Sequence, residues 1–254
     1  MSFVFTPPPV PAVPTAGGGS FPVHRIYCVG RNYAEHAREM GHSDRDPPFF
    51  FMKPADAVLP VAEGAVGEMA WPGLTDDLHH EVELVVAIGS GGRDIPVEQA
   101  AQHVWGYAVG LDMTRRDLQA QMKRQGRPWC IAKGFEQSAP IGPIHPAART
   151  GVLRRGAITL AVNGVQRQHG DLADLIWSVD ETIAALSRAW LLQPGEYLTA
   201  TFQVLVDNPV AVTQIINTAY SASQSQVLPI SDTITNSVSA TDLAVTKTVN
   251  NPNP

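Results

Sequence analysis

The chain has 254 residues, of which 44% are hydrophobic, and carries a formal net charge of -6. A chain of this length can bury one sizeable core, or one core with a small appended module. Its basic pairs are isolated, and its apolar runs are shorter than the roughly 20 residues that cross a bilayer, so we expect neither nucleic acid nor membrane as a partner.

Residues 1–20 are rich in proline and glycine, with no early lysine or arginine. A signal peptide needs a continuous apolar core, which these prolines interrupt, so the sequence predicts a flexible leader and a cytoplasmic protein. Cys28 and Cys130 have no CxxC partner and no histidine at metal-ligand spacing. We therefore interpret both as buried free thiols in a reducing compartment.

The segment after the leader mixes strands with single helices. Strands are expected at HRIYCVG (24–30), in FFFMKPADAVLP (49–60), where the strand leads into a loop, at ELVVAIG (83–89) and at GYAVGLDM (106–113), with a hairpin at 156–171 that turns at Asn163-Gly164. Helices are expected after Gly30, at PVEQAAQHV (96–104), at TRRDLQAQMKRQG (114–126) and at 178–192, where Ser178 and Glu181 fit a capping box. Without strict βαβ alternation, this order predicts a strand-rich α+β fold.

Composition changes abruptly near Gly195. From Thr201 onward the chain has one lysine, three aspartates and no arginine or histidine, and it is rich in Thr, Ser, Asn and Gln. Such polar, β-branched sequence is typical of short β-strands or of a disordered tail, and both alternatives stay open. We divide the chain into a leader (1–20), a main domain (21–196) and a tail (197–254).

Two glutamates stand at the start of the strand in DLHHEVELVVAIG. Glu81 and Glu83 are two residues apart, so on a strand they share one face. Asp112, at the end of the next expected strand, could join them. Three carboxylates suit a hard ion, so we expect Mg²⁺, with Mn²⁺ or Ca²⁺ as alternatives. Zn²⁺ is less suitable because it prefers histidine and cysteine ligands. The alternative to a metal site is that the two glutamates lie on a solvated strand edge or form salt bridges. We assign His79 and His80 outer-shell or packing roles.

Two further features could carry chemistry. His36 and Glu39 are one helical turn apart, so the carboxylate could orient the imidazole as a general base; an exposed polar helix face is the alternative. Lys133 is a lone lysine among apolar residues in WCIAKGF. Such a lysine often extends to the surface, but near a metal it can bind a carboxylate or a polarised carbonyl.

Taken together, IYCVGRNYAEHAREMG, PPFFFMKPADAV, DLHHEVELVVAIG, GYAVGLDMTRRDLQ, RPWCIAKGF and LADLIWSVDETIAALS resemble the fumarylacetoacetate hydrolase family, and within it the fumarylpyruvate hydrolase and acylpyruvase branch. The resemblance implies a mixed β-roll or barrel that forms a homodimer and binds one Mg²⁺ or Mn²⁺. It implies a metal site of Glu81, Glu83 and Asp112, and a His36–Glu39 pair that activates water. By the same resemblance, Lys133 is catalytic and contacts substrate together with Arg116 and Gln119.

The chemistry implied is hydrolysis of the carbon–carbon bond in a 2,4-dioxo acid, such as fumarylpyruvate or another acylpyruvate, to pyruvate and a carboxylic acid. The family alternatives are decarboxylation of oxaloacetate and isomerisation of a dioxo acid, because all three reactions use the same metal and enolate chemistry.

The tail departs from the family. The TGTP-containing segment expected after LxPGD is absent, and LLQPGEYLTATFQVLVD stands in its place. The tail resembles a repeated β-sandwich module of bacterial surface proteins. We therefore predict a C-terminally incomplete hydrolase fold joined to an unrelated tail, with weak or no activity unless the tail supplies substitute strands; an inactive fusion fragment or a surface structural protein is the alternative.

Overall fold

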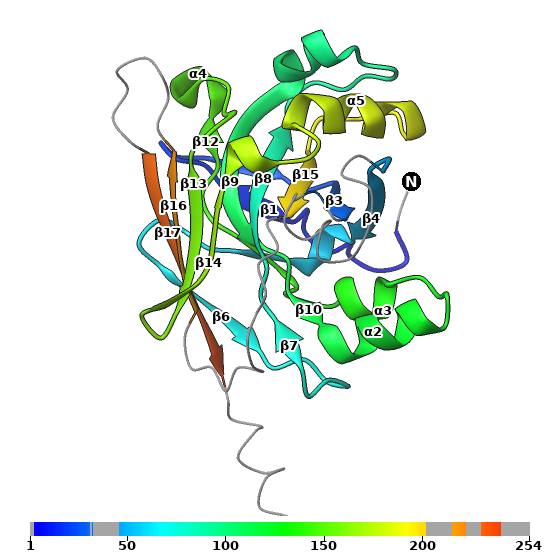
Figure 1. Cartoon of the computed structure of the whole chain (residues 1–254), viewed down its shortest axis with the longest axis vertical. Coiled ribbons are helices and arrows are strands. Elements are labelled where there is room, and N and C mark those ends of the chain that lie inside the picture. Colours follow the sequence, from blue (N-terminus) through cyan, green and yellow to red (C-terminus); the bar gives the residue numbers. More distant parts are fainter. Residues whose placement is uncertain (1–2, 31, 33–45, 202–214, 222–229, 240–254) are drawn as a thin grey trace, which may run out of the picture.

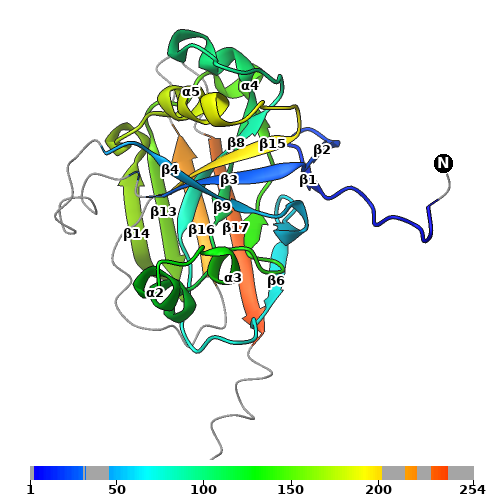
Figure 2. The same ribbon diagram turned by 90° about the vertical axis from the view of Figure 1, so that its right-hand side faces the viewer.

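A computed structural model of the chain describes residues 3–30, 32, 46–201, 215–221 and 230–239. Two large sheets dominate it, with short helices around their ends (Figure 1, Figure 2). In both views α4 and α5 lie near one end of the molecule, and α2 and α3 lie near the other.

The larger sheet has eight strands and carries most of the predicted site. Its order is β4 (Phe49–Lys53), β3 (Arg25–Gly30), β15 (Glu196–Thr201), β8 (Val82–Ile88), β9 (Val104–Leu111), β11 (Ala139–Ile141) and β5 (Val58–Pro60), with β12 (His145–Pro146) also paired to β9. β8 and β9 are antiparallel neighbours, and Glu83 lies opposite Gly110. This register brings the start of β8 beside the end of β9.

The second sheet has five strands in the order β14 (Val165–Asp171), β13 (Ala157–Val162), β16 (Ile215–Ser221), β17 (Ile230–Ser239) and β6 (Val66–Ala70). β13 and β14 form the predicted hairpin, and Asn163 and Gly164 at its turn have φ values of 52° and 77°. Positive φ at both central residues is the requirement of a type I′ turn, which explains this dipeptide. β16 and β17 come from the tail and fill the positions between β13 and β6.

Two short ladders and the helices complete the fold. The ladders join β1 (Ala12–Pro14) to β2 (Ser20–Pro22) and β7 (Leu78–His79) to β10 (Thr114–Arg115). The α-helices are α2 (Arg116–Arg124), α3 (Cys130–Lys133), α4 (Ala147–Thr150) and α5 (Val179–Ala189), and the 3₁₀ helices are η1 (Ala55–Ala57), η2 (Val97–His103) and η3 (Leu172–Asp174). The Ser178–Glu181 capping box at the start of α5 is formed as predicted.

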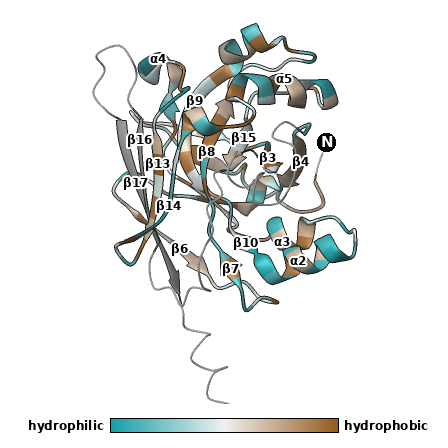
Figure 3. Cartoon of the chain, in the orientation of Figure 1, coloured by the Kyte–Doolittle hydropathy of each residue, from teal (hydrophilic) through white to brown (hydrophobic). Residues whose placement is uncertain are grey.

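The core lies on both faces of the larger sheet. Alternate residues of β3 show this division, because Tyr27 packs in one buried cluster and Cys28 packs in the other. The first cluster includes Ile183 and Leu186 of α5, both fully buried, and each such side chain contributes about 1.5–3 kcal/mol. Figure 3 shows the contrast between hydrophobic colour along β8 and β9 and hydrophilic colour along much of α2.

Several sequence expectations differ from the structure. Within the helix expected at 96–104, Val97–His103 form a 3₁₀ helix rather than a regular α-helix. Part of the expected flexible leader is ordered as the β1–β2 hairpin, since Val13 is fully buried against the second cluster. The expected boundary between residues 196 and 197 falls within β15, which pairs with β3 and β8. Cys130 is exposed instead of buried, whereas Cys28 is buried as expected.

No helix in the part of the chain that the structure describes is both long and apolar enough to cross a membrane.

Candidate metal and acid–base site

Glu83 and Asp112 lie close together because β8 and β9 are paired antiparallel strands. The backbone N–H of Asp112 donates to the carbonyl of Glu81 at 2.8 Å, just beyond the end of the ladder. The side-chain carbonyl of Gln168, from β14, accepts the N–H of Val82 at 2.8 Å and so secures the residue between the two glutamates. The three predicted metal ligands are therefore held on adjoining, hydrogen-bonded segments.

All three carboxylates are buried, with 1% of Glu81, Glu83 and Asp112 exposed. Buried charge requires compensation, because isolated carboxylates are poorly tolerated away from water. Two lysines supply much of the compensating positive charge. Lys133 Nζ lies 2.7 Å from Glu81 Oε2 and 2.5 Å from Asp112 Oδ2, and Lys53 Nζ lies 2.8 Å from Asp112 Oδ1.

Lys133 ends the short helix α3 and is 2% exposed. Burial alone would lower the pKa of its ammonium, but the Asp112 and Glu81 carboxylates outweigh that effect and raise the pKa above its ordinary value. A single nitrogen thus bridges two predicted metal ligands as a fixed positive charge. The position between the Glu81 and Asp112 carboxylates holds an ammonium, so these two residues fit a site for a cation.

Arg116 and Gln119 occupy one face of the first turn of α2. The Arg116 guanidinium donates to Glu81 and to Gln119 Oε1, and its Nε donates to His79 Nδ1 at 3.2 Å. Of the two predicted substrate contacts, Arg116 therefore lies next to Glu81, and Gln119 is hydrogen-bonded to Arg116. The Arg116 side chain is 25% exposed, so it lies between the buried carboxylates and solvent.

The two histidines, for which the sequence suggests outer-shell or packing roles, precede Glu81 in the chain. His79 Nε2 lies 2.8 Å from Asp77 Oδ1, and burial, then the Arg116 charge, lower the pKa of His79. His80 is almost fully buried, and burial, followed by the charge of His79, lowers its pKa to about 4. Neither histidine belongs to the cluster of potential ligand atoms among the described residues.

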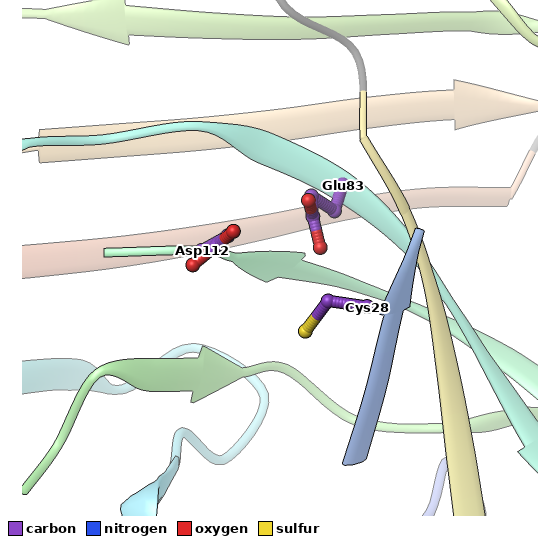
Figure 4. Close-up of side chains that lie close together, drawn as sticks. All are labelled: Cys28, Glu83 and Asp112. Atoms are coloured by element: carbon purple, nitrogen blue, oxygen red, sulfur yellow. The ribbon is translucent and has the colours of Figure 1, made fainter. Parts of the chain in front are cut away.

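That cluster contains one residue that sequence reasoning did not select. Cys28, Glu83 and Asp112 place ligand atoms within 4.8 Å of one another, and Figure 4 shows Cys28 of β3, Glu83 of β8 and Asp112, just after β9, converging on one space. Glu81 does not belong to this group, and its oxygens pair with Lys133 and Arg116. Burial, then the Asp112 and Glu83 charges, raise the pKa of Cys28 well above its ordinary value. The signal that could have found Cys28 is the alternation of HRIYCVG, but a sequence does not show which strands pair.

His36 and Glu39 lie outside the described residues. The described residues closest to them in sequence both contact Trp177. The Asn32 side chain accepts the Trp177 N–H at 2.7 Å and donates to the Trp177 carbonyl at 2.8 Å, and the Trp177 indole donates to the Asp46 carbonyl at 3.1 Å.

Comparisons with known proteins agree on one family. The family model described as "Fumarylacetoacetate (FAA) hydrolase C-terminal" matches residues 25–200. Oxaloacetate tautomerase YcgM of Escherichia coli is 40% identical over 183 residues, covering 71% of this chain and 82% of that protein. Human mitochondrial oxaloacetate tautomerase FAHD1 is 39% identical over 173 residues, covering 68% and 76%.

Among solved structures, fumarylpyruvate hydrolase from Pseudomonas aeruginosa in complex with Mn²⁺ and pyruvate is 47% identical. Its TM-score is 0.83, and the match covers 94% of this chain and 100% of that one. The predicted strand-rich α+β fold is confirmed by this likeness.

Proposed function

The chain belongs to the fumarylacetoacetate hydrolase family, and on this premise we propose that it hydrolyses the carbon–carbon bond of a 2,4-dioxo acid. The products would be pyruvate and a carboxylic acid, and the substrate would be fumarylpyruvate or another acylpyruvate. The observation that carries the proposal is the buried group of Glu81, Glu83, Asp112 and Lys133. The solved fumarylpyruvate hydrolase at 47% identity supports the substrate class.

Glu81, Glu83 and Asp112 would hold the divalent ion. An all-carboxylate set favours Mg²⁺ or Mn²⁺, with Ca²⁺ as the alternative. When bound, the ion would supply Lewis-acid polarisation of the 2-oxo acid.

The chain's own residues would handle charge and protons. Arg116 and Gln119 would bind polar groups of the substrate at the solvent side, where the guanidinium is partly exposed. His36, oriented by Glu39, would take a proton from the attacking water. The water oxygen adds to the 4-carbonyl carbon, the bond between carbons 3 and 4 breaks, and its electron pair passes to carbon 3 as the pyruvate enolate. Protonation of carbon 3 then gives pyruvate, and the acyl carbon leaves as the carboxylic acid.

Lys133 would stabilise the negative charge that develops on the enolate oxygen. Its ammonium keeps its charge because two carboxylates raise its pKa. A fixed donor in a buried site favours the transition state over the less charged substrate, which is the condition for raising kcat.

A second candidate is tautomerisation of oxaloacetate. It is favoured by the two relatives at 39–40% identity that carry that name. This reaction moves a proton between carbon 3 and the 2-oxygen without breaking a carbon–carbon bond, so it would use the same enolate-stabilising charge. We also propose a cytoplasmic homodimer, as the family resemblance implies.

The test is a comparison of substrates on the purified full chain with Mn²⁺ added. We expect pyruvate release from fumarylpyruvate or acetylpyruvate, and a fall in kcat of about 10²–10³-fold in Lys133→Met. Lys123→Met, on the exposed end of α2, is the matched control and should keep the activity. Rapid enol–keto conversion of oxaloacetate without pyruvate release from any acylpyruvate would replace the hydrolase proposal with the second candidate.

A further inference from the structure

A buried thiol lies directly against two of the predicted metal ligands. Cys28 is fully buried in β3, and its sulfur lies within 4.8 Å of carboxylate oxygens of Glu83 and Asp112. Figure 4 shows the three side chains directed into the same space. A small cavity is lined by all three, together with Lys53, Thr199 and Gly110.

Strand register explains why this arrangement exists. β3 pairs with β15 so that Cys28 lies opposite Thr199, and β15 pairs with β8 so that Thr199 lies opposite Val85. Val85 and Glu83 are two residues apart on β8, so they point to the same face. Cys28, Thr199 and Glu83 therefore share one face of the larger sheet, and Asp112 reaches the same space from the end of β9.

The chemistry of the donors in this space differs from that of an all-oxygen site. Carboxylates suit hard ions such as Mg²⁺ and Mn²⁺, whereas a thiolate selects softer ions such as Zn²⁺ and Cd²⁺. We propose that Cys28, Glu83 and Asp112 together bind a thiophilic divalent cation of the Zn²⁺ or Cd²⁺ class, which competes with the hard ion for the shared carboxylates. This inference rests on the proposed function only through the sharing of Glu83 and Asp112.

Lys53, which lies beside Asp112, can give way to a bound cation. Lys53 Nζ contacts Asp112 Oδ1, but it also donates to the carbonyls of Met113 and Lys133. When a cation binds Asp112, Lys53 keeps its two carbonyl acceptors and can give up the ion pair with Asp112. The thiol proton leaves to solvent as the sulfur–metal bond forms, because a coordinated thiol is deprotonated by the ion's own charge.

Absorption spectroscopy with Cd²⁺ tests the inference without measuring turnover. The other cysteine, Cys130, is exposed, so the starting protein is the full chain with Cys130→Ser, which retains one thiol. Titration with Cd²⁺ should produce an ultraviolet thiolate-to-cadmium charge-transfer band that saturates at one ion per chain. Adding Cys28→Ser or Cys28→Ala should abolish the band and weaken Cd²⁺ binding about 10- to 100-fold or more.

Competition with Mn²⁺, followed by the spin-resonance signal of the free ion, gives the second readout. Cd²⁺ should release bound Mn²⁺ from Cys130→Ser far more effectively than from the double variant, because only the former has the sulfur ligand. Mn²⁺ binding without a Cd²⁺ band would overturn the thiolate site and leave the proposed carboxylate site intact. Binding of neither ion would overturn both. A band that survives in the double variant, which has no thiol, would show that the band is not a thiolate-to-cadmium transition and would sink the inference.

Discussion

Lys53 joins two parts of the candidate site through one ammonium group. Its Nζ donates to the Met113 carbonyl at 3.2 Å and to the Lys133 carbonyl, and it forms an ion pair with Asp112 Oδ1 at 2.8 Å. The residue is 2% exposed. We predict that Lys53→Met, which keeps the length of the side chain and removes the charge, loosens the connection between the end of β9 and helix α3.

The loss of stability in Lys53→Met can be estimated from the Asp112 carboxylate, which loses one of its partners. Removing one member of a buried ion pair costs about 3–5 kcal/mol, because the other charge stays buried. Lys133 still pairs with Asp112, so we expect the lower value, about 3 kcal/mol. For a chain of this size that loss corresponds to a fall in Tm of about 6–12 °C.

Thermal and urea unfolding of the full chain provide the assay, with Lys123→Met as a control at an exposed position of α2. The control should stay within about 0.5 kcal/mol of the parent. Mn²⁺ should raise the Tm of Lys53→Met more than that of the parent, since an added cation replaces the missing charge beside Asp112. A Lys53→Met protein as stable as the parent would refute the reasoning that this ammonium secures the site.

Three other substitutions probe the site and its support. Glu83→Gln should weaken Mn²⁺ binding more than about tenfold, judged by the metal-induced shift in Tm, whereas Glu68→Gln at an exposed position should not; equal shifts in both variants would exclude Glu83 as a ligand. Gly110→Ala would place a Cβ 2.7 Å from a neighbouring valine methyl group and should cost about 1–3 kcal/mol in urea unfolding, while Gly73→Ala, with open space around it, should be nearly neutral. Ser178→Ala removes the side chain that accepts the Glu181 N–H and should lower stability by about 1 kcal/mol; no change in the urea midpoint would mean that this cap contributes nothing.

Local signals in the sequence predicted local structure well. The Asn163-Gly164 turn and the Ser178 cap are both formed, because each depends on backbone conformations within a few residues. The sequence suggested from the end of its strand alone that Asp112 could join the glutamates, and in the structure the backbone N–H of Asp112 donates to the Glu81 carbonyl. The 3₁₀ form of residues 97–103 was not predicted, since hydrophobic spacing does not distinguish one helical hydrogen-bond pattern from the other.

Cys28 and Lys53 were not predicted at the site because their roles depend on strand pairing. Sequence spacing isolates Cys28, yet β3 lies one strand away from β8, with β15 between them. β15 comes more than a hundred residues later in the chain, and only the assembled sheet brings it between β3 and β8. For the same reason, the leader looked flexible in isolation, although Val13 is buried by residues that are distant in sequence.

The two tail strands, β16 and β17, complete the five-stranded sheet, so we expect the stability of the fold to depend on them. The family model matches residues 25–200, so β16 and β17 lie beyond it, yet they join β13 to β6 in the five-stranded sheet. Removing residues 202–254 would leave a long edge on β13 and a second on β6, and unpaired strand edges promote association between chains. We therefore expect the shortened chain to aggregate, as measured by light scattering after size exclusion, and to lose the cooperative unfolding of the full chain. A monodisperse shortened chain with an unchanged Tm would show that the tail strands contribute little to stability and would refute this expectation.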